Sequence, residues 1–122
     1  MTAPFLLLAA VFGFLGVAMG AFGAHGLKHI LSPQLFEVYK TAVDYQMWHA
    51  LALGLTALLP PQRLMRWAAC LFTAGIILFS GSLYLLAILD MSWLGIITPF
   101  GGLAFLAGWA LLAWAAYPKK PE

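Results

Sequence analysis

Three histidines and a short run of charged side chains are the residues of this sequence that could carry chemistry. His25 and His29 flank a short polar turn, and His49 follows Asp44 in a segment that then becomes strongly apolar. Imidazole can bind a metal ion or change its charge near neutral pH, and a carboxylate can exchange a proton. The candidate chemistries are therefore proton handling, ligand binding and metal ligation.

The charged run has the spacing of one helix face. Glu37, Lys40 and Asp44 recur at i, i+3 and i+7, which gives an acid-base-acid ladder. One interpretation is a self-neutralising ladder, in which Lys40 extends outward while its stem covers apolar surface. The other gives Asp44 a binding or proton-handling role. On a helix His49 points about 140° away from Asp44, so these two residues are not expected to act as a pair.

Metal ligation has weaker support. His25 and His29 would share a helix face only if the turn between them stayed helical, with Glu37 or Asp44 as a third ligand. Gly26 instead predicts a helix end, where His25 would bond a freed carbonyl. We therefore predict no metal site and no cofactor, and haem or metal ligation is the least favoured role.

Other polar side chains lie in the segment L-F-S-G-S-L-Y, where small hydroxyls commonly bond to their own or a neighbouring helix. We find no Ser-His-Asp order, phosphate loop, paired catalytic carboxylates or cysteine cluster, so no catalytic residue and no enzyme activity is predicted. The candidate polar site inside the membrane comprises His25, Glu37, Lys40, Asp44, Tyr45, His49, Ser80 and Tyr84.

The composition indicates the solvent that surrounds these residues. Of 122 residues, 64% are apolar and 8% charged, against roughly 45–50% and about 25% in soluble domains. Segments 1–24, 67–89 and 91–118 lack charged side chains and are long enough for a membrane of ~30 Å. The run 50–59 becomes long enough only if its helix extends back through Lys40. The lipid bilayer is thus the expected partner, and a net charge of +2 spread over both ends argues against nucleic acid.

We therefore predict a single all-α domain over 1–122, an integral membrane four-helix transmembrane bundle with short loops. The expected spans are 4–24, 33–59, 67–89 and 99–117. Ser32 and Thr98, each before a proline, are predicted to cap helices, and Pro60-Pro61 to end one. A cleaved signal peptide is the alternative for the first segment, but no Lys or Arg precedes it and the membrane pattern continues after it.

Orientation and depth follow from these spans. Arg63, Arg66, Lys119 and Lys120 share one face, against Lys28 and Lys40 on the other, so both termini are predicted to be cytoplasmic. Counting back from Leu59 puts Asp44 roughly 6 Å and His49 roughly 13 Å below the outer boundary.

Glycines form a stripe on two of the predicted spans. Such stripes allow close contact between helices in lipid, either inside one bundle or between subunits. The helix-packing residues predicted in this way are Gly13, Gly16, Gly20, Gly23, Gly101 and Gly108.

Four motifs together carry a resemblance to a known family. They are G-A-F-G-A-H-G-L-K, Y-Q-M-W-H-A-L-A-L, L-F-S-G-S-L-Y and I-T-P-F-G-G, at 20–28, 45–53, 78–84 and 97–102. With these four motifs in this order, the chain resembles the YgdD family of small bacterial inner-membrane proteins. The resemblance implies a four-span bundle in the cell inner membrane and supplies no catalytic residue.

Three functions remain open from the sequence. The first is a structural or accessory protein that packs against itself as a homo-oligomer, or against a membrane-protein partner, through the glycine stripes. The second is a small transporter or channel subunit with a polar path that includes Asp44 and His49. The third is a metal- or haem-binding subunit.

Overall fold

The computed structural model describes residues 3–121 and contains no strand in that range. Helix α1 spans Ala3–His25, α2 spans Pro33–Leu58 and α5 spans Thr98–Ala116. Between α2 and α5, one rod consists of α3 (Arg63–Gly75), the π-helical turn η2 (Ile76–Ser80) and α4 (Gly81–Leu89). Two short 3-10 segments, η1 (Leu27–His29) and η3 (Ser92–Ile96), lie in the connections. The predicted all-α fold class is confirmed.

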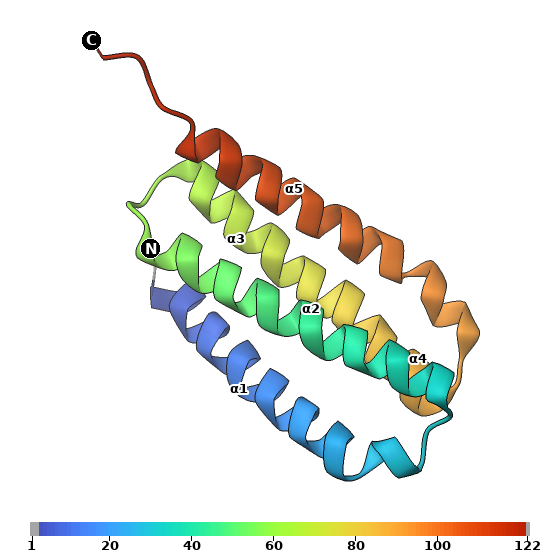
Figure 1. Cartoon of the computed structure of the whole chain (residues 1–122). Coiled ribbons are helices and arrows are strands. Elements are labelled where there is room, and N and C mark those ends of the chain that lie inside the picture. Colours follow the sequence, from blue (N-terminus) through green and yellow to red (C-terminus); the bar gives the residue numbers. More distant parts are fainter. Residues whose placement is uncertain (1–2, 122) are drawn as a thin grey trace.

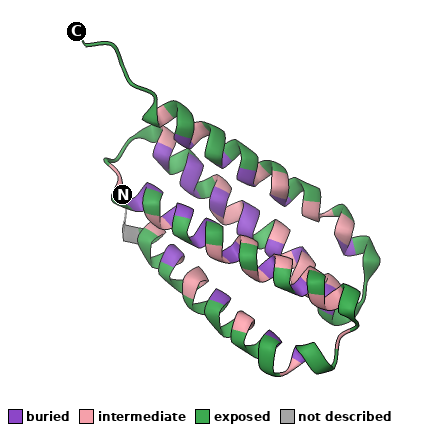
Figure 2. Ribbon diagram, in the orientation of Figure 1, coloured by how far each residue is buried: buried purple, intermediate pink, exposed green. Residues whose placement is uncertain are grey.

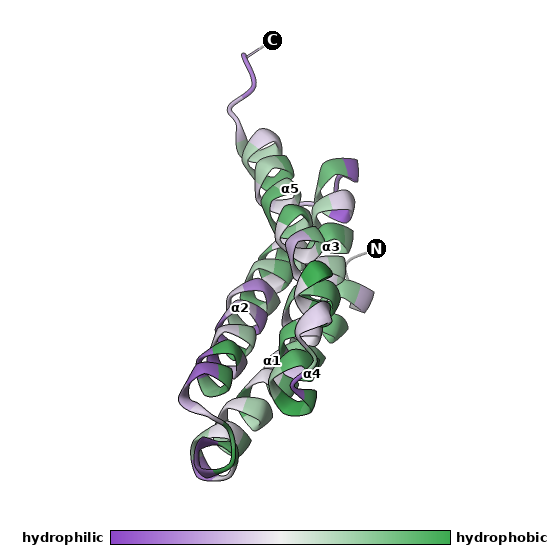
Figure 3. Ribbon diagram, turned by 90° about the vertical axis from the view of Figure 1, so that its right-hand side faces the viewer, coloured by the Kyte–Doolittle hydropathy of each residue, from purple (hydrophilic) through white to green (hydrophobic). Residues whose placement is uncertain are grey.

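Three helical stretches of the described chain are long and apolar enough to cross a membrane, namely Pro4–His25, Arg63–Leu89 and Ser92–Ala116. Helix α2 has the length, at 26 residues, but is less apolar. Figure 3 shows hydrophilic turns recurring along it. Its charged and amide side chains lower its mean hydropathy, so a fourth span stays a prediction.

The ends of the helices test the predicted caps. The Ser32 hydroxyl accepts a hydrogen bond from the backbone N–H of Leu35 at 3.2 Å, which confirms this cap. Helix α2 ends before Pro60, as expected. The cap predicted at Thr98 is wrong, because no side chain caps α5 and the Thr98 hydroxyl instead lies 2.6 Å from that of Ser82. The Thr98 hydroxyl bonds to the buried Ser82 hydroxyl of α4 instead of to its own helix end, and this bond ties the start of α5 to α4.

The long helices run antiparallel to their neighbours in sequence. Figure 1 places the α2–α3 connection at the same end as both chain ends, and the other two connections at the far end. Helix α1 packs along α2, and α5 packs along α3 and η2, while α2 also contacts α3, η2 and α4. Helices α1 and α5 therefore form the two edges, and α2 and the α3–α4 rod lie between them.

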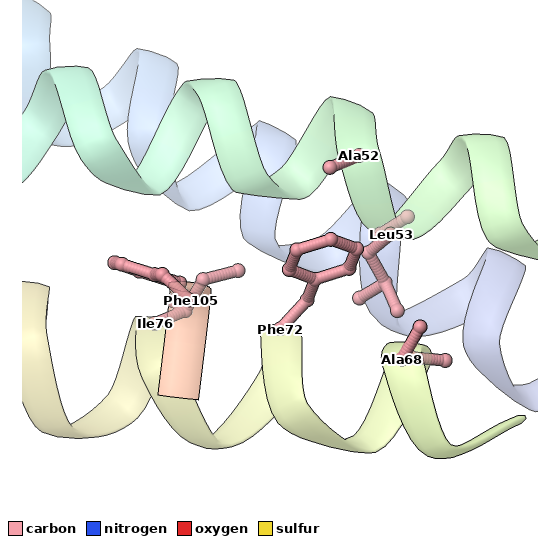
Figure 4. Packing of buried hydrophobic residues seen from close by; sticks show 8 residues of the cluster. Ala52, Leu53, Ala68, Phe72, Ile76 and Phe105 are labelled. Atoms are coloured by element: carbon pink, nitrogen blue, oxygen red, sulfur yellow. The ribbon is translucent and has the colours of Figure 1, made fainter. Parts of the chain in front are cut away.

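The apolar core sits where α2 faces α3 and α5. Leu53 and Phe72 are fully buried in it, and the other buried members of this cluster are Ala9, Ala52, Ala68, Ala69, Ile76 and Phe105 (Figure 4). Burial is concentrated on α2 and α3, whereas α1 and α5 show mostly exposed turns (Figure 2). Large apolar side chains such as Phe14 and Trp114 are 74% and 73% exposed. An apolar surface of this extent requires lipid around it.

The glycine stripes face neighbouring helices of the same chain. A Cβ atom on Gly16 or Gly23 would overlap a side chain of α2, and one on Gly20 would lie 3.4 Å from Val43. On α5, a Cβ on Gly101 would overlap the backbone of Phe79, and one on Gly108 would come 2.7 Å from the Phe72 ring. Gly13 differs from the others, since a Cβ there would meet nothing within 4 Å.

Candidate polar site inside the helix bundle

The face of α2 that points into the bundle carries polar side chains, spaced so that they share this one face of the helix. Tyr39, Gln46 and His49 are all buried, at 1%, 4% and 5% exposure. Gln46 lies two turns after Tyr39, and His49 follows Gln46 by three residues, so all three point to one side. Each of them bonds to a different part of the bundle.

His49 links α2 to α5, and its two bonds fix its tautomer. Its Nδ1 lies 2.8 Å from the carbonyl oxygen of Tyr45, which can only accept, so Nδ1 carries the proton. Its Nε2 accepts a hydrogen bond from the indole N–H of Trp109 at 3.0 Å. The Phe105 ring stacks on the imidazole, with centroids 3.5 Å apart. His49 is therefore neutral with both nitrogens occupied, and protonation would break the bond to Trp109.

Gln46 connects three helices through one amide group. Its Nε2 donates to the carbonyl of Phe12 on α1 at 2.8 Å, and its Oε1 accepts from the Tyr84 hydroxyl on α4 at 2.6 Å. Sequence reasoning selected Tyr84 but missed Gln46. The available signal was the spacing of the two residues, because Gln46 lies about one turn before His49 on the same face of α2.

Two further hydroxyl groups bond to backbone carbonyls across helix interfaces. The Tyr39 hydroxyl donates to the carbonyl of Met19 on α1, and the Ser80 hydroxyl of η2 donates to that of Ala42 on α2 at 2.8 Å. The Tyr39 and Tyr84 rings meet edge to face at 5.4 Å. The polar side chains of this region thus hold helices together.

The glycines of α1 explain how α2 reaches these carbonyls. In a helix, a side chain lies over the preceding turn, so the side chain of residue i+4 covers the carbonyl of residue i. Phe12 and Met19, the two accepting residues, each precede a stripe glycine by four residues. A Cβ on Gly23 would overlap the Tyr39 ring, and one on Gly16 would lie 3.6 Å from Gln46 Cδ. The missing side chains leave the carbonyls open to donors from α2.

The charged ladder lies elsewhere, on the outer face of α2. Glu37 and Lys40 form an exposed ion pair at 2.7 Å, and Lys40 Nζ lies 5.3 Å from the centre of the Phe36 ring. With Asp44 they line a groove of about 240 Å³ between α1 and α2, and His49 is not among its lining residues. Asp44 is itself exposed.

The remaining candidates are placed as follows. His25 is exposed at the end of α1, and Tyr45 is half-buried against the Phe79 ring, with centroids 4.5 Å apart. The structure brings Tyr84 to Gln46 and joins His49 to the Tyr45 backbone, but it leaves His25, Asp44 and His49 in separate environments. Within residues 3–121, no three His, Cys, Asp or Glu side chains come together in a way that could hold a metal ion.

The interior and the exterior together define a class of protein. Every buried side-chain nitrogen and oxygen within residues 3–121 has a hydrogen-bond partner, while the outer surface is largely apolar. This is the inverse of a soluble domain and defines a helical membrane protein whose interior polar groups bond to one another.

Comparison with known proteins places the chain within that class. The family described as "Protein of unknown function (DUF423)" matches residues 19–102. The UPF0382 membrane protein YwdK of Bacillus subtilis is 43% identical, over 92% of this chain and 94% of its own. The UPF0382 inner membrane protein YgdD of Escherichia coli is 40% identical, over 98% and 95%. The chain belongs to this family of membrane proteins, which confirms the resemblance. No solved structure gives a significant match.

Proposed function

We propose that this chain is a structural or accessory protein of the cell inner membrane, which crosses the bilayer four times with both termini in the cytoplasm. The assignment to the inner membrane is supported by the relative YgdD, whose name describes it as an inner membrane protein. The orientation is supported by Arg63 and Arg66 at the start of α3 and by Lys119 after the end of α5, because Figure 1 shows these ends of the two helices on the side of both termini.

Helix α2 supplies the fourth crossing in this proposal. Its 26 residues extend roughly 39 Å at 1.5 Å per residue, enough to cross the ~30 Å hydrocarbon layer. It runs beside α1 along its length and is flanked by apolar helices. Polar groups inside a membrane are tolerated where they face protein, and Gln46 and His49 do so.

The observation that carries the packing role is the state of His49. A histidine that relays a proton or binds a ligand needs a partner that can exchange a proton, or an open nitrogen lone pair, whereas His49 is bonded to a carbonyl that only accepts and to an indole N–H that only donates. Gln46 and Tyr39 are likewise bonded to neighbouring helices. Because the glycine stripes contact helices of the same chain, a second copy or a partner protein would use the lipid-facing surfaces instead.

The alternative of a transporter or channel subunit would need its polar side chains to face one path. Asp44 lies on the outer face of α2, whereas His49 and Ser80 are buried in bonds to α5 and α2 respectively. The arrangement therefore gives the packing role the better support.

Reconstitution separates the two functions. Purified protein in proteoliposomes should give proton and cation flux equal to that of protein-free vesicles between pH 6 and pH 8. His49→Ala should leave flux at that level and lower the temperature of unfolding in detergent. A pH-driven flux in the wild type that is lost in both Asp44→Asn and His49→Ala would contradict the packing role and support transport.

A further inference from the structure

A crevice of about 740 Å³ opens between the beginnings of α1 and α3, away from the polar interior. Pro4 and Phe5 of α1 line one side, and Arg63, Arg66, Trp67 and Cys70 of α3 line the other. The four α3 residues follow the i, i+3, i+4, i+7 spacing of one helix face, and all four are exposed. The buried face of α3, with Ala68 and Phe72, points into the core instead.

The two arginines of this crevice have no anionic partner in the described chain. The one ion pair within residues 3–121 joins Lys40 to Glu37, at the other end of the bundle. The first turn of α3 has no acidic residue, and no side chain caps its beginning. Two guanidinium groups one turn apart therefore face an open, partly apolar crevice with their charge unbalanced. Guanidinium groups bind phosphate oxygens with paired hydrogen bonds.

A second opening lies further along the same two elements, α1 and the α3–α4 rod, and the crevice and this opening are together called the seam below. This opening of about 360 Å³ is lined by Phe12, Leu15 and Met19 of α1 and by Ile76, Ile77 and Gly81 of the α3–α4 rod, among others. Phe5, Phe12 and Met19 are seven residues apart and so share one face of α1. Ile77 lies roughly 16 Å along the helix from Arg66, about half of the ~30 Å hydrocarbon layer. The seam thus matches one leaflet in depth.

We propose that this seam binds an anionic phospholipid, with the headgroup phosphate on Arg63 and Arg66 and an acyl chain between α1 and the α3–α4 rod. Charge complementarity selects a headgroup of net negative charge, and basic pockets between membrane helices bind such headgroups. The second, apolar opening favours a lipid over free phosphate, because a lipid has an acyl chain to place there. Trp67, 57% exposed beside the arginines, lies at the interfacial level that its amphipathic ring prefers.

The test is native mass spectrometry of the detergent-solubilised full chain with phosphatidylglycerol or phosphatidylcholine of identical acyl chains. Wild-type protein should bind the anionic lipid about tenfold more tightly, and added salt should reduce the difference. The variant Arg63→Gln/Arg66→Gln should lose this preference. The variant Lys119→Gln/Lys120→Gln removes equal charge from the same end but outside the crevice, so it should keep the preference. Both pairs of side chains are exposed, and circular dichroism checks that the helices remain.

A second pair of variants tests the acyl chain. Ile77→Trp should fill the seam and weaken binding of both lipids, whereas Leu78→Trp, an exposed neighbour outside the seam, should not. Three results would overturn the proposal: equal affinity of the wild type for the two lipids, equal loss in the arginine and lysine variants, or displacement of the lipid by an equal concentration of inorganic phosphate.

Discussion

The indole nitrogen of Trp109 on α5 donates to Nε2 of His49 on α2 across 3.0 Å, and this bond assigns the imidazole proton to Nδ1. Trp109 also meets the Phe72 ring edge to face at 5.2 Å, so its position is set from two sides. His49 is therefore a link between α2 and α5, and the same bond together with the Phe72 ring holds Trp109 in place.

Loss of the Trp109 donor should destabilise the bundle. Trp109→Phe leaves the buried Nε2 of His49 without its partner, which costs about 1 kcal/mol or more of unfolding free energy. The measurement is reversible unfolding of the detergent-solubilised protein. Trp114→Phe is the matched control, because Trp114 is 73% exposed, and this variant should change stability little. Equal losses in the two variants would mean that the bond contributes nothing.

The bond between Gln46 and Tyr84 should appear as an energetic coupling. Gln46→Leu and Tyr84→Phe each leave the other side chain without a buried partner, so the double variant should lose less stability than the two single losses added together. We expect a coupling of about 1 kcal/mol, within the range of hydrogen bonds between membrane helices. Unfolding free energies of the four proteins give this value, and simple additivity would contradict it.

One added methyl group should destabilise the protein at one end of the α1 glycine stripe but not at the other. Gly23→Ala places a Cβ against the Tyr39 ring and should cost about 1–3 kcal/mol. Gly13→Ala meets nothing within 4 Å and should be neutral, or stabilising by up to about 1 kcal/mol through helix propensity. In a Tyr39→Ala background, Gly23→Ala should lose most of its effect. If that effect persists there, the ring is not what limits residue 23.

The crossing of α2 can be tested by the accessibility of single cysteines. In a Cys70→Ser background, cysteines at Gln62 and Lys119 should react with a membrane-impermeant reagent from the cytoplasmic side only. Cysteines at Lys28 and Met91 should react from the opposite side only. Labelling of residues 28 and 62 from the same side would show that α2 does not cross the membrane.

The glycine stripes show which features of the site could be predicted from the sequence and which could not. Gly16 and Gly23 were recognisable by spacing, but spacing does not say which helix they contact. Tyr39 and Gln46 were not selected, because their spacing with His49 places them on one helix face but does not show what they bond to. Their roles depend on carbonyl groups about 20 and 34 residues away, those of Met19 and Phe12. The Thr98 hydroxyl similarly bonds to Ser82 rather than to its own helix end.

The sequence alone determined the helical class and the membrane as solvent, because these follow from composition and from the length of uncharged segments. It also placed the ends of α2, since Ser32 and Pro60 act through local backbone chemistry. Only the tertiary structure decided which polar groups meet. Helix periodicity gives the direction of a side chain about its own axis, but it does not select the neighbouring helix. Periodicity therefore already separated His49 from Asp44, but only the tertiary structure showed that His49 faces the bundle and bonds to Trp109 while Asp44 is exposed.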